Sequence, residues 1–450
     1  MKNTPLKKLF GTDGIRGKAN LYPLLPETVA TIGRAITSYF SKNGKTSVNA
    51  AIGMDPRASS QMLLNAISSG IMGAGGDVFN LGVTPTPLVS DFVRHNNCDF
   101  GIVISASHNP FYDNGIKIFN NSGEKLSDSE ELEIEKIFFE EKCQNENSIG
   151  KIIDKTESYK EYVVRLKNTF SKKLKNCSFK ICVDCANGAS FKVAPELFQS
   201  IKGITSYFSS INPNGFNIND NCGALFPEKL SASVIEKKCD IGITYDGDAD
   251  RLITVDENGN VVDGDQLIAI FAKHLKKSKN LNNNTVVTTI MSNSGFEKFL
   301  LKEEIKLLRT SVGDRYVFEK MKEIGAVLGG ENSGHIIFSN INPTGDGILA
   351  SLMILAVMNS TKKKLSELAS EVKLYPQILT KIKVNEKRPL ETIPGLKELV
   401  KKEEQTLSGG RILIRYSGTE PVLRIMAEGP EIESVRKTVK NLADFFKNKL

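Results

Sequence analysis

A serine in a polar turn is the first candidate for chemistry. Ser107 follows the apolar run 100–104 and stands among serine, asparagine and proline. In an α/β sheet, ligands bind beyond the carboxyl ends of the strands, which is where a reactive serine belongs. The G-x-S-x-G pattern of a hydrolase is absent, which argues against an acyl-enzyme serine. His108 is adjacent in sequence and so need not face the Ser107 hydroxyl. An ordinary polar turn is the alternative interpretation.

Three aspartates at alternate positions, with small residues between them, are the second candidate. Carboxylates at this density repel one another unless a cation joins them, and hard oxygen ligands suit Mg²⁺. An EF-hand loop is excluded because its sixth position needs glycine and here holds Arg251. A guanidinium matches phosphate oxygens bidentately, so Arg251 favours a metal site that also meets phosphate. A solvated acidic turn is the alternative. The aspartates are Asp246, Asp248 and Asp250.

Three glycine-bearing loops could bind the rest of a substrate. Residues 415–421, with Arg424 beyond them, combine hydroxyls, a glycine and arginines, which is typical of an anion nest without the lysine of a P-loop. In 329–335, glutamate, asparagine, serine and histidine can hydrogen-bond several sugar hydroxyls. A hairpin turn and a glycine-rich turn are the respective alternatives. Arg16, in the loop 10–17, is either a phosphate contact or an ion-pair partner.

Together these motifs supply a serine carrier, a metal site, a phosphate anchor and a sugar reader, as phosphoryl transfer by positioning and electrostatics requires. Alternating helix and strand patterns up to about residue 370 predict parallel or mixed sheets flanked by helices. A strand, an asparagine-bearing turn and a helix recur near 179–201 and 285–301, which suggests an internal repeat. The smaller C-terminal part alternates strands with helices as an α+β module. Its predicted strands are 378–384, 410–416 and 422–428.

Composition limits the function classes further. A chain of 450 residues predicts about three domains of roughly 150 residues each. The net charge of +7 is modest, and we interpret it as a diffuse excess of lysine, with no nucleic-acid partner. Residues 1–17 contain no apolar signal core, and the run 347–358 is too short to span a bilayer, so no membrane role is expected. Seven scattered cysteines suit a reducing cytoplasm.

The four motifs resemble those of the α-D-phosphohexomutases, and the similarity runs from end to end of the chain. The family phosphorylates the serine that precedes histidine, so the resemblance selects Ser107 over Ser105. Further segments resemble the branch of the family that acts on phosphoglucosamine. Two positions depart from the usual pattern without removing a ligand: Ala249 where glycine is common, and Asn332 where glutamine or methionine is usual. The family motifs match 105–110, 246–251, 330–335 and 415–421, and the branch features match 10–17, 107–117, 312–316 and 417–421.

The resemblance implies a heart-shaped α/β protein of four domains, three related ones with mixed sheets and a C-terminal α+β domain, around a central cleft. The implied domains are 1–152 for the phosphoserine, 153–254 for the metal, 255–370 for the sugar and 371–450 for phosphate.

The resemblance also implies a role for each motif residue. Phosphoserine 107 would exchange its phosphoryl group with O1 or O6 of the sugar through a bound glucosamine 1,6-bisphosphate. One Mg²⁺ per chain would be held by the Ser107 phosphate and the three aspartates. Lys117 would act as general acid/base if neighbouring cations depress its pKa, and Arg251 would assist. His108 and His335 are further catalytic candidates. The substrate-binding candidates are Arg16, Glu331, Ser333, Arg415, Ser417, Gly418, Thr419 and Arg424.

The implied enzyme is a cytoplasmic isomerase, an intramolecular phosphotransferase that interconverts glucosamine 6-phosphate and glucosamine 1-phosphate for UDP-N-acetylglucosamine and cell-wall precursor synthesis. A phosphomannomutase or phosphoglucomutase is the alternative. A non-catalytic sugar-phosphate-binding protein is disfavoured because Ser107 and the three aspartates are all present. Activation of Ser107 could come from a kinase, autophosphorylation or a sugar bisphosphate, and a homodimer stays open.

Overall fold

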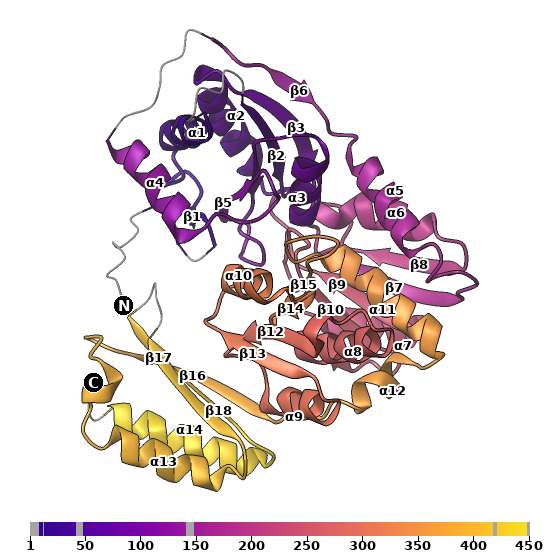
Figure 1. Ribbon diagram of the computed structural model, residues 1–450, viewed down its shortest axis with the longest axis vertical. Helices are drawn as coiled ribbons and strands as arrows, with labels where there is room; N and C mark the ends of the chain where they lie inside the picture. The colour runs from indigo at the N-terminus through magenta and orange to yellow at the C-terminus, as the bar shows by residue number, and fades with distance from the viewer. Residues whose placement is uncertain (1–8, 12, 42–47, 141–147, 417–420, 448–450) are drawn as a thin grey trace. The chain divides into compact units, whose positions relative to one another are not determined.

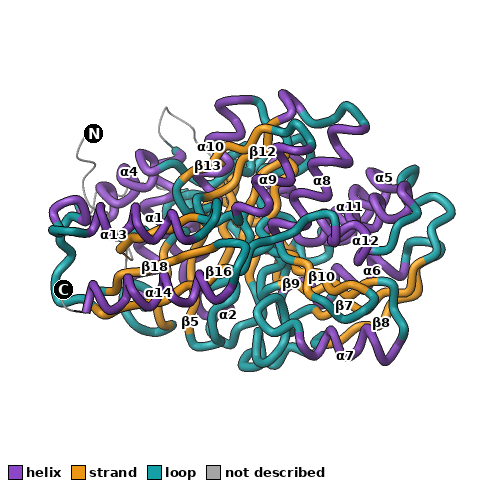
Figure 2. The backbone as a smooth tube through the Cα atoms, turned by 90° about the horizontal axis from the view of Figure 1, so that it is seen from below, coloured by secondary structure: helices purple, strands orange, loops and turns teal. Residues whose placement is uncertain are grey.

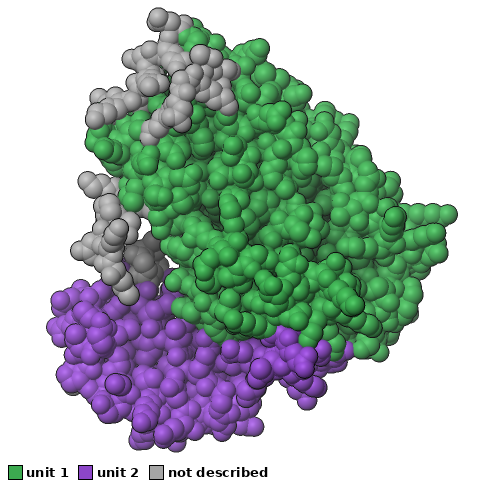
Figure 3. All heavy atoms as spheres, in the orientation of Figure 1, with its two compact units in different colours: residues 1–290, 306–369 green, residues 291–305, 370–450 purple. Residues whose placement is uncertain are grey.

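The computed structural model describes residues 9–11, 13–41, 48–140, 148–416 and 421–447. The chain divides into two compact units (Figures 1 and 3). Unit 1 comprises residues 1–290 and 306–369, and unit 2 comprises residues 291–305 and 370–450.

Unit 1 contains three sheets. The strands of the first are β1 (Ile15–Lys18), β2 (Asn49–Met54), β3 (Asp77–Val83), β4 (Phe100–Ile104), β5 (Asp113–Asn120) and β6 (Ile152–Asp154). Those of the second are β7 (Phe179–Asp184), β8 (Ile204–Ser209), β9 (Ile241–Tyr245), β10 (Leu252–Asp256) and β11 (Val261–Val262). Those of the third are β12 (Thr285–Thr289), β13 (Lys306–Thr310), β14 (Leu328–Gly330) and β15 (Ile336–Phe338).

One strand order recurs in all three sheets. It reads β5-β4-β2-β3 in the first, β10-β9-β7-β8 in the second and β15-β14-β12-β13 in the third. In each sheet, three strands are parallel and the fourth pairs antiparallel with the third. The internal repeat predicted for the second and third segments is therefore present, and it extends to the first sheet.

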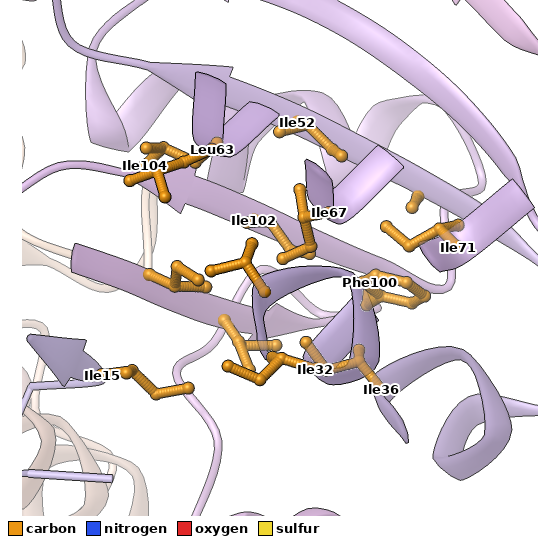
Figure 4. Close-up of a cluster of buried hydrophobic side chains, with 14 of the residues drawn as sticks. Ile15, Ile32, Ile36, Ile52, Leu63, Ile67, Ile71, Phe100, Ile102 and Ile104 are labelled. Atoms are coloured by element: carbon orange, nitrogen blue, oxygen red, sulfur yellow. The ribbon is translucent and has the colours of Figure 1, made fainter. Parts of the chain in front are cut away.

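Helices cover both faces of the first sheet, because its central strands are apolar and buried on both sides. On one face, α1 and α2 contribute isoleucines at helical spacing to the main core (Figure 4). On the other face, Val89 and Val93 of α3 lie against Gly53 and Gly101, where a larger side chain would not fit. The helices around the first sheet are α1 (Pro26–Phe40), α2 (Ser60–Gly73), α3 (Thr86–His95) and α4 (Asp128–Phe139).

Helices also cover the second and third sheets. Figure 2 shows α7 on one side of the second sheet and α5 and α11 on the other. The run 347–358 is a buried helix, as predicted, and every residue of that run in α11 is buried. No helix in the described part of the chain is long and apolar enough to cross a membrane. These helices are α5 (Tyr159–Phe170), α6 (Val193–Gln199), α7 (Glu228–Lys237), α8 (Gly264–Lys277), α10 (Asp314–Ile324), α11 (Gly347–Thr361) and α12 (Leu365–Ser370), with 3-10 turns η1 (Ala189–Phe191) and η2 (Asn282–Asn284).

Unit 2 is built on an antiparallel sheet of order β16-β18-β17. Alternate residues of β18, Leu423 and Ile425, pack against α14, whose buried Leu442 and Phe446 lie four residues apart. The predicted α+β module is confirmed. Its elements are α9 (Ser294–Lys302), β16 (Gln377–Lys383), η3 (Leu390–Thr392), α13 (Leu396–Thr406), β17 (Arg411–Tyr416), β18 (Val422–Glu428) and α14 (Ile432–Lys447).

Candidate active site

Three connections occupy the same place in the repeated sheet of unit 1. Each joins the third strand to the antiparallel fourth: residues 105–112 between β4 and β5, 246–251 between β9 and β10, and 331–335 between β14 and β15. These are the serine turn, the aspartate loop and the sugar loop predicted from the sequence. Because the repeat places them at equivalent sheet edges, residues 139 apart (Ser107 and Asp246) and 85 apart (Asp250 and His335) meet in one buried cluster.

The two serine hydroxyls of the serine turn have different partners. Ser107 is 1% exposed, and its Oγ donates a hydrogen bond to Asp246 Oδ2 at 2.5 Å. His108 Nδ1 lies 3.3 Å from the same Oγ, so the imidazole does face the hydroxyl. The Ser105 Oγ instead donates to Asp55 Oδ2 at 2.6 Å and accepts from the Ser107 N–H. Ser107 is therefore the serine of the pair whose hydroxyl reaches the aspartate loop.

The three predicted metal ligands converge. One carboxylate oxygen of each of Asp246, Asp248 and Asp250 lies within 4.8 Å of the others, and all three residues are buried. Asp248 Oδ1 and Asp250 Oδ1 have no hydrogen-bond partner among the described residues. Buried carboxylate oxygens without partners are costly unless a cation binds them, so the donor set fits a divalent metal ion. Ala249 has a φ of 57°, a left-handed conformation that explains why glycine is common at this position.

Lys117 lies inside this cluster. Its Nζ is 2.8 Å from Asp248 Oδ2 and 2.9 Å from Asp250 Oδ2, and the side chain is 1% exposed. Burial alone would lower its pKa, but the carboxylates of Asp13, Asp248 and Asp250 hold the pKa of Lys117 well above its usual value. The condition named for Lys117, a pKa depressed by neighbouring cations, is therefore not met, because the nearest charges are carboxylates.

Two arginines border the serine turn and the aspartate loop. Arg251 Nε lies 3.9 Å from Asp246 Oδ2 and from Asp250 Oδ1. Arg16 donates from Nη1 to the carbonyl oxygen of residue 106 at 3.4 Å, which places it beside the serine turn. Burial, together with the positive charges of Arg251 and Arg16, lowers the pKa of His108 to about 4, so its imidazole is neutral near pH 7.

The sugar loop joins the same cluster through His335. Its ring nitrogens lie 3.6 Å from Asp250 Oδ1 and 3.1 Å from Asp314 Oδ2, so this histidine is held between carboxylates. Burial, followed by the negative charge of Asp314, raises the pKa of Glu331. Ser333 Oγ is buried without a hydrogen-bond partner among the described residues, as suits a hydroxyl that awaits a ligand.

Some residues of the cluster had no counterpart in the sequence prediction. Lys125 Nζ lies 2.5 Å from both Asp13 Oδ1 and Asp314 Oδ2, and Asp13 also pairs with Arg16. Thr86 Oγ1 donates to an aspartate-loop oxygen, Asp248 Oδ2, at 2.6 Å. Asp13 and Asp314 stand in segments singled out by the resemblance, whereas Lys125 and Thr86 belong to no motif and carried no signal.

The phosphate-loop residues Ser417, Gly418 and Thr419 lie outside the described residues. Arg415 and Arg424, predicted beside them, are register partners on β17 and β18 in unit 2. Like charges directly opposite each other on antiparallel strands are unfavourable. Burial and the charge of Arg424 lower the pKa of Arg415. An anion bound between the two guanidinium groups would relieve this repulsion.

Comparison with known families covers almost the whole chain. Models of phosphoglucomutase/phosphomannomutase alpha/beta/alpha domains I, II and III match residues 7–145, 157–259 and 263–375, and the C-terminal domain model matches residues 379–445.

Curated relatives and solved structures agree with these matches. The chain is 47% identical to the phosphoglucosamine mutase of Geobacter metallireducens over 99% of both chains. It is 44% identical to that of Lawsonia intracellularis over 97% of this chain and 98% of the relative. A phosphoglucomutase/phosphomannomutase family protein from Burkholderia thailandensis shares the fold with a TM-score of 0.80 at 22% identity, covering 98% of this chain and 97% of that one. Aspergillus fumigatus N-acetylphosphoglucosamine mutase, solved with GlcNAc-6P and magnesium, has a TM-score of 0.73 at 18% identity, with 98% and 96% coverage.

Proposed function

The chain belongs to the phosphoglucomutase/phosphomannomutase family, in its phosphoglucosamine mutase branch, and we propose that it interconverts glucosamine 6-phosphate and glucosamine 1-phosphate with Ser107 as the phosphoryl carrier. The enzyme is an isomerase, because substrate and product differ only in which hydroxyl bears the phosphate. The observation that carries the proposal is the 2.5 Å hydrogen bond from Ser107 Oγ to Asp246, beside two carboxylate oxygens that accept no hydrogen bond among the described residues.

Two transfers of opposite direction make up the proposed reaction. A free sugar hydroxyl attacks the phosphorus on Ser107, and the bond from phosphorus to Oγ breaks. The sugar hydroxyl loses its proton, and Ser107 Oγ gains a proton as it leaves. The resulting glucosamine 1,6-bisphosphate turns around. Ser107 Oγ then attacks its other phosphate, and the sugar oxygen that leaves takes back a proton. The serine ends phosphorylated, as it began.

The buried charges of unit 1 support these transfers. Lys117, kept protonated by its carboxylate neighbours, stabilises negative charge near the transferred group and can donate a proton to a leaving oxygen. Arg251 and Arg16 add positive charge beside the serine turn. The neutral His108 lies within reach of Oγ. One Mg²⁺ held by Asp246, Asp248, Asp250 and the Ser107 phosphate would offset the charge of that phosphate.

Substrate recognition rests on the remaining loops. Glu331 and the unpartnered Ser333 hydroxyl would bind sugar hydroxyls in both orientations of the intermediate, and His335 would hold the loop against Asp250. In unit 2, the phosphate that does not react would bind Arg415 and Arg424, together with the predicted contacts Ser417, Gly418 and Thr419. The proposal also includes the four domain boundaries named above and a cytoplasmic location. It further includes activation of Ser107 by a kinase, by autophosphorylation or by a sugar bisphosphate, and a homodimer.

Replacement of the carrier tests the mechanism. We expect Ser107→Ala to lose at least about 1000-fold in kcat, because the variant lacks the hydroxyl that carries the phosphoryl group, while the thermal midpoint stays within a few degrees. Ser122→Ala, which removes an exposed hydroxyl after β5, is the matched control and should retain full activity. Substantial turnover by Ser107→Ala, with no phosphate on the protein by intact mass spectrometry, would contradict the proposal.

The sugar is tested separately. A coupled assay with Mg²⁺ and a trace of sugar 1,6-bisphosphate compares glucosamine, glucose and mannose phosphates. The branch assignment predicts the highest kcat/KM for glucosamine phosphate. A higher value for mannose or glucose phosphate would favour the alternative activity of the same family.

A further inference from the structure

The Ser107 turn is bent in an uncommon way. Ser107 has a φ of 54°, in the left-handed region that residues other than glycine rarely adopt. This conformation directs Oγ to Asp246. Sparsely populated backbone conformations persist only where the surrounding structure determines them, so some group must hold the turn in place.

Arg57, which follows β2, is the group behind the turn. Its side chain is fully buried and its Nε donates to Asp55 Oδ2 at 2.8 Å. Nη2 donates to Ser107 O at 2.9 Å and to Asn109 O at 2.8 Å. Nη1 donates to two more carbonyl oxygens, that of Asp113 at 3.1 Å and that of Pro110. All five N–H groups of one guanidinium are thus used, four of them on a single seven-residue stretch of backbone.

Asn219 holds the same turn from another direction. Its Nδ2 donates to Ser107 O at 2.9 Å and to Asn109 O at 3.2 Å. These two carbonyl oxygens therefore each accept from both Arg57 and Asn219. Gly247, in the aspartate loop, lies so close that a Cβ there would be 2.5 Å from Ser107 O. The carbonyl side of the turn is enclosed by protein.

We propose that Arg57 is a positioning residue for phosphoryl transfer: it binds the carbonyl oxygens of the Ser107 turn and so sets the direction of the Ser107 hydroxyl. This inference rests on the proposed role of Ser107 as carrier. Arg57 does not bind the phosphosugar, because it is 2% exposed and every N–H has a protein acceptor. Lysine cannot replace it, because an ammonium has three donors and lacks the planar fork that reaches several carbonyl oxygens at once.

An ordinary structural ion pair would have a different geometry. A pair that served only to neutralise Asp55 would need one or two bonds between the two side chains. Here one guanidinium N–H goes to the carboxylate and four go to the turn. Asp55 in turn accepts from the Arg57 backbone N–H at 3.1 Å and from Ser105 Oγ. The pair is therefore tied to the serine segment from both ends.

The test compares Arg57→Lys with Arg165→Lys. Arg165 is a partly buried arginine paired with Asp91 on α3, and neither residue belongs to the proposed site, so this variant controls for loss of an arginine–carboxylate pair. Steady-state kcat and KM are measured with the full-length enzyme, Mg²⁺ and glucosamine 6-phosphate. Intact mass spectrometry follows phosphorylation of Ser107 by glucose 1,6-bisphosphate, and thermal midpoints report folding.

For Arg57→Lys we expect kcat and the phosphorylation rate to fall by about 100-fold, as a misplacement of about 1 Å can cause, while KM changes less than about threefold. Arg165→Lys should keep both rates. In Asn219→Ala, Arg57 still binds the turn, so kcat should fall by about tenfold while KM changes less than about threefold. If Arg57→Lys does not fold, Asn219→Ala is the variant that tests the proposal. A kcat within threefold of the unmodified enzyme in both folded variants would overturn the proposal, and so would a loss that falls on KM alone.

The phosphorylation assay separates this inference from the proposed function. If the unmodified enzyme acquires phosphate at Ser107 but does not convert glucosamine phosphates, the sugar assignment fails and the Arg57 comparison still stands. If the unmodified enzyme acquires no phosphate at Ser107, the carrier role fails and the Arg57 inference fails with it.

Discussion

Asp248 Oδ1 and Asp250 Oδ1 are buried carboxylate oxygens without a hydrogen bond in the described part of the chain. With Asp246 they place three carboxylates within reach of one ion, and Lys117 lies against Asp248 and Asp250 at hydrogen-bond distance. Burial of like charges is unfavourable, and a bound divalent ion reverses this effect. The affinity for Mg²⁺ should therefore appear directly in the stability of the folded protein.

We expect Mg²⁺ to raise the thermal midpoint of the metal-free protein. A ligand that binds only the folded state stabilises it by about 2.7 kcal/mol at a hundredfold excess over its Kd. Asp246→Asn keeps the side-chain size but removes one charged ligand, so the rise should fall to less than about half. Differential scanning fluorimetry at several Mg²⁺ concentrations measures both effects. Asp220→Asn, an exposed aspartate, is the control, and an equal Mg²⁺ response in Asp246→Asn would exclude the carboxylate site.

Residues inside short motifs could be predicted from the sequence, and residues outside them could not. Ser107 and the aspartates are recognisable because chemistry needs those residue types at close spacing. Arg57 and Asn219 act through carbonyl oxygens of a turn that is distant in sequence, so only the folded chain shows what they bind. Lys125 could not be predicted for the same reason, because the two carboxylates that it contacts come from separate segments of the chain.

Sequence periodicity identified the buried parallel strands but missed most of their antiparallel partners. The apolar run 100–104 is the buried strand β4, as expected. The missed β5 contains asparagine, glycine and a lysine, and this lysine, Lys117, belongs to the site. The helix α3 has Pro87 in its first turn, where a missing N–H is tolerated, so a proline there is compatible with a helix.

The sheet of unit 2 suggests a third cation for phosphate binding. Lys381 on β16 and Arg415 on β17 are both register partners of Arg424 on β18, so the three side chains lie in one row on one face. Lys381 is exposed. It can therefore approach an anion that binds the arginine pair.

We expect Lys381→Met to raise KM for glucosamine 6-phosphate about fivefold with little change in kcat. A single charge about 4 Å from a phosphate near a protein surface contributes a few kcal/mol at most, and solvent exposure reduces this to about 1 kcal/mol. The effect should shrink as ionic strength rises. Lys383→Met is the control, because this exposed lysine lies two residues along the same strand, opposite Val422. Equal KM values for the two variants would remove Lys381 from the phosphate site.

At the scale of the molecule, buried polar contacts join helices α3, α5 and α11 of unit 1. Tyr162 of α5 donates from its hydroxyl to Asp346 Oδ2 at 2.6 Å, and Asn342 donates to the same oxygen at 3.0 Å. Asp346 Oδ1 accepts from the N–H of Leu349 and so caps α11. Asn342 also donates to the carbonyl oxygen of Pro87 in α3, at 3.1 Å. Asp346 thus links α5 to α11 directly, and both to α3 through Asn342.

This junction leads to a prediction about cooperative unfolding. Tyr162→Phe removes one donor from the buried Asp346 while it keeps the ring, so we expect unit 1 to lose about 1–2 kcal/mol of stability. Hydrogen exchange read by mass spectrometry should show faster exchange together in α3, α5 and α11, since a shared junction makes them open as one unit. Peptides from β16 and β18 in unit 2 are the internal reference and should keep their protection. Tyr159→Phe, a change at a partly buried tyrosine of the same helix that does not contact Asp346, is the matched control. Faster exchange confined to α5 would mean that the three helices open separately and that the Asp346 contacts do not couple them.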